Sequence, residues 1–116
     1  MHNFRKLDIW MEARQLVKEI YLLTKNYPMQ EQFGLTSQIR RAVISIPSNI
    51  AEGSSKSSDK DFARFLEMSI GSSYELETQS TLSYDLAYLS EEQFERITSS
   101  LQSHQKKMYN FKKKLI

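Results

Sequence analysis

The sequence contains no cysteine, only two prolines and only three glycines among its 116 residues. The missing cysteines exclude a disulfide framework and any metal site built from thiolates. The scarcity of glycine and proline argues against a loop-rich or β-sandwich fold. No run of about 18 apolar residues is present, and the opening MHNFRKLDIWMEAR lacks the apolar stretch of a secretion signal. These absences predict a soluble cytoplasmic protein without a membrane span.

Apolar residues recur every three or four positions in four segments, which is the spacing of amphipathic helices. The predicted helices span residues 8–27, 36–52, 59–88 and 91–114. Ser90 and Gln93 fit a capping box at the start of the fourth helix, and Gly53 is predicted to end the second in the left-handed conformation. We therefore predict an all-α fold, an antiparallel up-down four-helix bundle that forms one domain over residues 1–116.

Small residues interrupt the apolar stripe of the predicted third helix. Gly71 and several serines occupy its middle, and they are expected to let a neighbouring helix approach closely. In the connection after the first helix, Phe33 and Leu35 are expected to pack beneath the loop. These details predict where the helices touch one another.

The segment RRAVISIPSNIAEG, residues 40–53, combines helical spacing with a proline. Pro47 has no N–H to donate to the carbonyl of Val43, and its ring clashes with that carbonyl at a cost of about 3 kcal/mol. We predict a kink in the second helix at Pro47, with the freed carbonyl bonded by Asn49, an arginine or a water. A ligand or partner site is the alternative interpretation of this polar segment. Its candidate partner surface comprises Ser45, Pro47, Asn49, Glu52 and Gly53.

Residues 38–79, which contain SIPSNIAEG and GSSYELETQ, resemble the 23S rRNA intervening-sequence proteins. These are four-helix bundles encoded within intervening sequences of bacterial 23S rRNA genes, and residues 4–28 and 31–42 resemble the family as well. The resemblance implies an up-down bundle that is frequently a homopentamer, with no established enzymatic activity. Related bundles are strongly basic accessory subunits of the reverse transcriptases of diversity-generating retroelements; this chain, with a net charge of +2, is less basic.

Catalytic and metal chemistry find little support in the sequence. A di-iron bundle needs Glu-x-x-His motifs, but residue 101, three before His104, is leucine. No nucleophile elbow or glycine-rich phosphate loop occurs. We predict no enzyme activity, no catalytic residue, no metal and no cofactor. His104 is expected to be a core histidine bonded within the bundle, for example to a serine of the third helix.

Positive charge is concentrated in residues 104–116, which hold five lysines and no acidic residue. Two functions stay open: a homo-oligomeric interaction or scaffold protein, and a bundle that binds phosphates of structured RNA or DNA. A nucleic-acid-processing protein is a further possible partner. The predicted phosphate-binding residues are Arg40, Arg41, Lys106, Lys107, Lys112, Lys113 and Lys114. A solvated helix end is the alternative interpretation of the lysine cluster.

Overall fold

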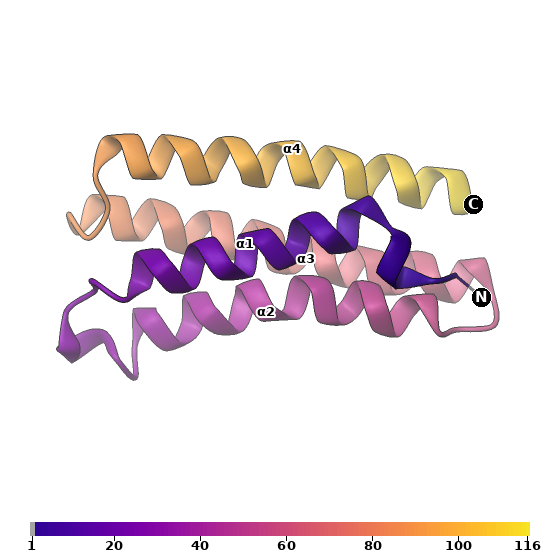
Figure 1. The fold of residues 1–116 in the computed structure, drawn as a ribbon, viewed down its shortest axis with the longest axis horizontal. Helices are drawn as coiled ribbons and strands as arrows, with labels where there is room; N and C mark the ends of the chain where they lie inside the picture. Colours follow the sequence, from indigo (N-terminus) through magenta and orange to yellow (C-terminus); the bar gives the residue numbers. More distant parts are fainter. Residues whose placement is uncertain (1) are drawn as a thin grey trace.

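Four long helices build the computed structural model, which describes residues 2–116 (Figure 1). They are α1 (Asp8–Thr24), α2 (Leu35–Ser54), α3 (Asp59–Asp85) and α4 (Glu91–Leu115). Single 3-10 turns, η1 (Phe4–Lys6) and η2 (Met29–Glu31), precede α1 and α2. No strand occurs in the described part of the chain. The prediction of an all-α fold of four helices is confirmed.

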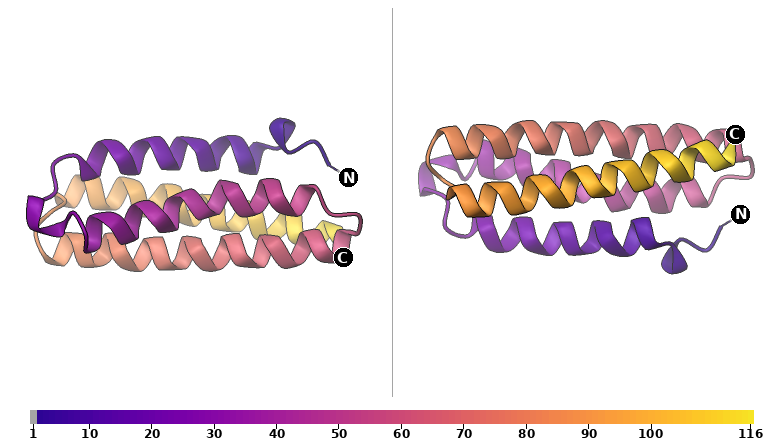
Figure 2. Two further views of the ribbon diagram at one scale, coloured as in Figure 1. Left: turned by 90° about the horizontal axis from the view of Figure 1, so that it is seen from below. Right: turned by 90° about the horizontal axis from the view of Figure 1, so that it is seen from above.

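Successive helices run in opposite directions along a bundle with extents of 43 × 24 × 20 Å (Figures 1 and 2). Each helix packs against its neighbours in sequence, and α1 also packs against α4, while the backbones of the diagonal pairs stay apart within residues 2–116. The pair α2–α3 has the most extensive contact and α1–α4 the least. The described N-terminal residues and the C-terminus lie at the same end of the bundle (Figure 1).

The core is formed by one apolar seam from each helix. Its fully buried large side chains include Ile20, Ile39, Ile46, Ile50, Phe62, Leu66, Leu76, Ile97, Leu101 and Met108. Because these residues recur at three- and four-residue spacing, packing the four seams together removes their side chains from water. Removal of that surface is the main favourable term for this fold.

The helix ends follow local hydrogen bonding, with corrections to the predicted bounds. The capping box of Ser90 and Gln93 is confirmed. α1 ends at Thr24 and not at residue 27, because a turn follows in which the Tyr27 N–H bonds the Thr24 carbonyl at 3.1 Å. α3 ends at Asp85 and not at residue 88, because Ala87 adopts a φ of 65°. That left-handed residue closes a Schellman-type end, in which the Tyr88 N–H bonds the Ser83 carbonyl at 2.8 Å.

Gly53 does not end α2 in the left-handed conformation, so that prediction is wrong. It is a buried residue of α2, which continues to Ser54, and no glycine in the described chain has a positive φ. A Cβ atom on Gly53 would lie 2.6 Å from Phe65 Cβ and 2.9 Å from Phe62 Cδ1. Glycine is therefore required by the close approach of α3.

The small residues of α3 divide into two groups. Ser69, Ser73, Ser80 and Ser83 are fully buried. The Ser69 hydroxyl donates to the Ile46 carbonyl of α2 at 2.9 Å, a buried bond between helices. Gly71, in contrast, is exposed, and a Cβ added to it would meet no atom within 4 Å. The expectation that Gly71 allows a close helix contact is therefore wrong.

The two helical glycines provide a matched pair of substitutions. Gly53→Ala is expected to lower the free energy of unfolding by about 2 kcal/mol, since the added methyl overpacks against Phe65 close to its backbone. Gly71→Ala is expected to raise it by about 0.5–1 kcal/mol, because alanine loses less conformational entropy in a helix. Urea unfolding followed by circular dichroism measures both. Equal changes in the free energy of unfolding, with the same sign in both variants, would contradict the close packing of Gly53 and the exposure of Gly71.

Candidate functional site

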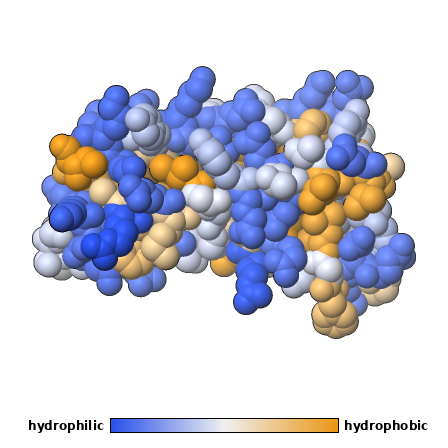
Figure 3. All heavy atoms as spheres, turned by 180° about the vertical axis from the view of Figure 1, so that it is seen from behind, coloured by the Kyte–Doolittle hydropathy of each residue, from blue (hydrophilic) through white to orange (hydrophobic). Residues whose placement is uncertain are grey.

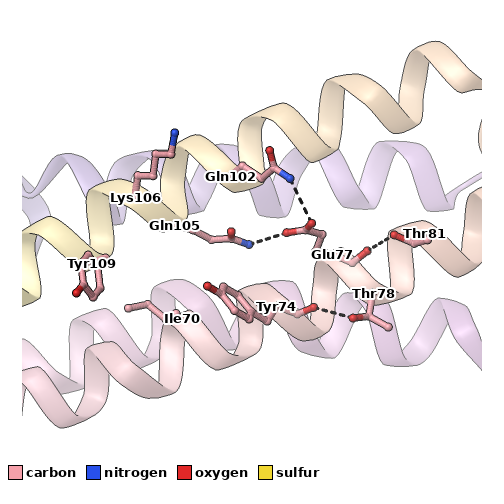
Figure 4. A pocket seen from close by; sticks show the side chains of 9 residues that line it. All are labelled: Ile70, Tyr74, Glu77, Thr78, Thr81, Gln102, Gln105, Lys106 and Tyr109. Carbon is pink, nitrogen blue, oxygen red and sulfur yellow. Dashed lines mark hydrogen bonds between the residues drawn. The ribbon is translucent and has the colours of Figure 1, made fainter.

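A groove of about 710 Å³ runs between α3 and α4 (Figure 4). Its lining residues come from both helices and are Ile70, Tyr74, Glu77, Thr78, Thr81, Gln102, Gln105, Lys106 and Tyr109. Tyr74 is 61% exposed and Tyr109 is 53% exposed, so both side chains are accessible from solvent. The groove combines aromatic walls with a polar centre.

The carboxylate of Glu77 occupies the centre of this groove. Gln105 Nε2 donates to Glu77 Oε1 at 3.0 Å, and Gln102 Nε2 approaches Glu77 Oε2 at 3.4 Å (Figure 4). Gln105 Nε2 also reaches Ser73 Oγ at 3.0 Å. These amides hold the carboxylate in place without neutralising it, and no lysine or arginine of residues 2–116 forms an ion pair with it.

The other polar groups of the groove are directed elsewhere. The hydroxyls of Thr78 and Thr81 donate to backbone carbonyls of their own helix, those of Tyr74 and Glu77. The ammonium group of Lys106 points away from Glu77 in Figure 4. Sequence reasoning missed this site. Ser73 and Glu77 are four apart and Gln102 and Gln105 three apart, so each pair shares a helix face, but their meeting depends on how α3 and α4 pack.

Pro47 lies in a second groove, of about 440 Å³, between α1 and α2. Apolar side chains form most of its lining, which is Phe4, Trp10, Arg14, Val17, Ile44, Pro47, Ser48 and Ala51. The Phe4 and Trp10 rings meet edge to face at 5.0 Å, and the Arg14 guanidinium lies 5.0 Å from the Trp10 ring centroid. The 3-10 turn η1 thus helps to form this groove.

The other members of the predicted partner surface do not line that groove. Asn49 Nδ2 donates to the Ser45 carbonyl at 2.9 Å, and the Ser45 hydroxyl donates to the Ala42 carbonyl at 2.7 Å. Glu52 is exposed, and Gly53 is buried against α3. The structure therefore leaves Ser45, Asn49 and Glu52 along one side of α2, while Pro47 faces the α1–α2 groove and Gly53 faces α3. Asn49 does not bond the Val43 carbonyl, α2 continues through Pro47, and the kink stays a prediction.

The predicted basic residues are also divided. Lys107 Nζ pairs with Glu12 at 3.0 Å, and Lys112 Nζ pairs with Glu67 at 2.8 Å, which lowers the pKa of Glu67 through a hydrogen bond and the nearby charge. Lys113 lies over the Tyr109 ring at 5.6 Å. Among residues 2–116, no carboxylate pairs with Lys106, Lys113 or Lys114. Only part of the lysine cluster is free to contact phosphate.

Arg40 and Arg41 belong to the first turns of α2, which begins at the opposite end of the bundle from the C-terminus (Figure 1). Arg40 Nε donates to Thr24 Oγ1 at 2.8 Å, and its guanidinium lies 4.4 Å from the Tyr21 ring centroid. The two arginines line a pocket of about 420 Å³ with Tyr21, Gln32, Phe33, Thr36 and Ser37. Phe33 is 90% exposed there, so the expectation that it packs beneath the connection is wrong.

His104 is only 1% exposed and joins α4 to α1. Its Nε2 lies 2.7 Å from the Ile9 carbonyl, so the expected serine partner is replaced by a backbone group of α1. Nε2–H is the donor in this geometry, and Nδ1 has no hydrogen-bond partner in the structure. Burial lowers the pKa of His104 below its ordinary value, which favours the neutral ring.

Two further features of the described residues bear on function. Nowhere in residues 2–116 do three His, Asp or Glu side chains gather closely enough to hold a metal ion. None of the helices in this range combines the length and apolarity of a membrane crossing. On the face opposite to that of Figure 1, apolar side chains gather in separate patches toward both ends, with hydrophilic side chains between them (Figure 3).

Comparison with known proteins finds a matching family model and a solved structure with a similar fold. The family model described as 23S rRNA-intervening sequence protein matches residues 5–110. A solved structure from Bacteroides thetaiotaomicron, described as a protein of unknown function from the S23 ribosomal protein family, superimposes with a TM-score of 0.83 at 25% identity. The match covers 90% of this chain and 98% of that one. No curated protein matches the chain.

The neutral His104 predicts a pH dependence of stability. A histidine whose folded pKa is depressed stabilises the fold fully above its unfolded pKa, near 6.5, and this contribution is lost as pH falls toward the folded pKa. The free energy of unfolding is therefore expected to fall as the pH is lowered through the unfolded pKa near 6.5 toward the folded pKa. His104→Gln should flatten this dependence. An unchanged slope in His104→Gln would contradict the assignment.

Proposed function

Because this chain belongs to the 23S rRNA-intervening sequence protein family, we propose that it is a non-enzymatic homo-oligomer that acts as an interaction or scaffold protein. The groove between α1 and α2 carries the proposal, since it leaves a mainly apolar surface around Trp10, Ile44 and Pro47 open to solvent. Burying such a surface in a second copy of the chain removes it from water. A pentamer is the assembly that the family resemblance implies.

A closed ring needs two different surfaces of one chain, because each copy contacts its neighbours head to tail. The outer face of α3, the helix diagonal to α1, supplies a complementary stripe of Met68, Glu75 and Leu82 at seven-residue spacing. Met68 and Leu82 are exposed apolar residues, and Glu75 between them is exposed. In the α1–α2 groove, Arg14 stands between the apolar lining residues Trp10 and Val17 along α1. We pair Arg14 of one copy with Glu75 of the next.

Charge reversal tests this pairing. Arg14→Glu and Glu75→Arg are each expected to reduce the solution mass toward that of a 13.6 kDa monomer, because like charges then face each other across the contact. The double variant restores the opposite charges and is expected to recover the assembly. Light scattering coupled to size-exclusion chromatography measures the mass.

Glu95→Arg, an equivalent reversal at an exposed site on α4, serves as the control and should leave the mass unchanged. A monomeric wild-type protein would overturn self-association itself. An oligomeric wild type with unaffected single variants would overturn only the pairing of Arg14 with Glu75.

Association with nucleic acid is the second candidate function, and the pocket of Arg40 and Arg41 favours it. Guanidinium groups bind phosphates, and an exposed aromatic ring such as Phe33 stacks on a base. The unpaired lysines Lys113 and Lys114 would add non-specific phosphate contacts at the other end of the bundle.

Salt dependence tests this candidate. Binding of a structured RNA is expected to weaken at least tenfold between roughly 50 and 200 mM salt, since each phosphate contact releases counterions. At the lower salt concentration, Arg41→Gln and Phe33→Ala should bind this RNA more weakly than the wild type does. Glu95→Gln should bind it as the wild type does. Absence of binding at both salt concentrations would remove this candidate for the isolated protein.

A further inference from the structure

The α3–α4 groove presents a negative charge that is held in place but left uncompensated. Glu77 is half-buried, each of its carboxylate oxygens faces one glutamine amide, and no cation of the described chain pairs with it. An ionised carboxylate has about four lone-pair positions, so the two amides leave positions free for further donors. Glu67, on the same helix, is in contrast paired with Lys112.

We infer that this groove binds an arginine side chain of a partner protein. A guanidinium presents parallel N–H groups in a planar fork, which matches the open positions of a fixed carboxylate. The exposed ring of Tyr74 lines the same groove and offers an aromatic contact to a cation, whereas the Tyr109 ring already has Lys113 5.6 Å from its centroid. Ile70 supplies an apolar contact for the methylene stem of the arginine.

The size and charge of the groove favour this ligand. Its volume of about 710 Å³ accommodates an arginine together with parts of its neighbouring residues. The carboxylate at its centre repels phosphate, so nucleic acid is not the expected occupant. A single carboxylate without other acidic ligands also provides no cage for a metal ion.

Lys106 on the rim opposes the binding of a cation. Its ammonium group is directed away from Glu77 (Figure 4), yet it remains the nearest cationic side chain of the lining. Removal of this charge should therefore strengthen binding, whereas removal of the Glu77 charge should weaken it. These opposite signs distinguish a charge-selective site from a general loss of structure.

The inference does not depend on the proposed self-association. Met68, Glu75 and Leu82, the residues of the proposed stripe, are absent from the lining of the groove. A monomeric wild-type protein would therefore overturn the ring without affecting the arginine site.

The test uses a fluorescein-labelled peptide with the sequence Leu-Ala-Arg-Ala-Leu, titrated with the full-length protein and followed by anisotropy. The same peptide with citrulline, an uncharged analogue of arginine, is expected to bind about fivefold more weakly. Glu77→Gln should weaken binding of the arginine peptide by about the same factor and leave the affinity for the citrulline peptide unchanged. Lys106→Gln should strengthen binding of the arginine peptide, and Tyr74→Ala should weaken its binding.

Glu95→Gln removes a carboxylate outside the groove and is the matched control. Equal affinity for the two peptides, or a Glu77→Gln variant that binds as the wild type does while its circular dichroism is unchanged, would overturn the inference. A Glu77→Gln variant with reduced solution mass would overturn it as well, because a second copy of the chain would then supply the cation.

Discussion

At Gly53 the backbone of α2 lies so close to α3 that a single Cβ atom would meet Phe65 at 2.6 Å. The same interface buries Ser69, whose hydroxyl donates to the Ile46 carbonyl one residue before Pro47. These contacts join a helix that contains an internal proline to its neighbour. The remaining helices pack around this pair, since α1 contacts α2 and α4 contacts α3 more extensively than α1 and α4 contact each other.

This arrangement explains where the candidate binding surfaces occur. The two main grooves lie along the seams α1–α2 and α3–α4, on either side of the tightly packed α2–α3 pair. Larger side chains such as Trp10 and Tyr74 border these seams, whereas Gly53 and Ser69 let α2 and α3 approach closely. The α1–α2 groove is mainly apolar and suits a protein surface. The α3–α4 groove holds the fixed Glu77 carboxylate and suits a cation.

Periodicity was sufficient to predict the four helices, because each helix must bury an apolar stripe and the stripe recurs at a fixed spacing. The Ser90 capping box was predictable for a similar reason, since both of its partners lie within one helical turn. Gly53 was mistaken for a helix end because sequence does not distinguish a glycine needed for φ from one needed for space. Ala87, which does adopt a positive φ, carries no comparable signal.

The candidate sites were harder to predict. The five lysines of residues 104–116 are close in sequence but point in several directions around α4, and Lys107 and Lys112 meet Glu12 and Glu67 on other helices.

The sequence by itself determined the number of helices, their apolar faces and the local cap at Ser90, because these depend on residues within a few positions of one another. Only the tertiary structure decided that Glu77 meets Gln102 and Gln105 and that Pro47 lies opposite Trp10, because these contacts depend on how whole helices pack.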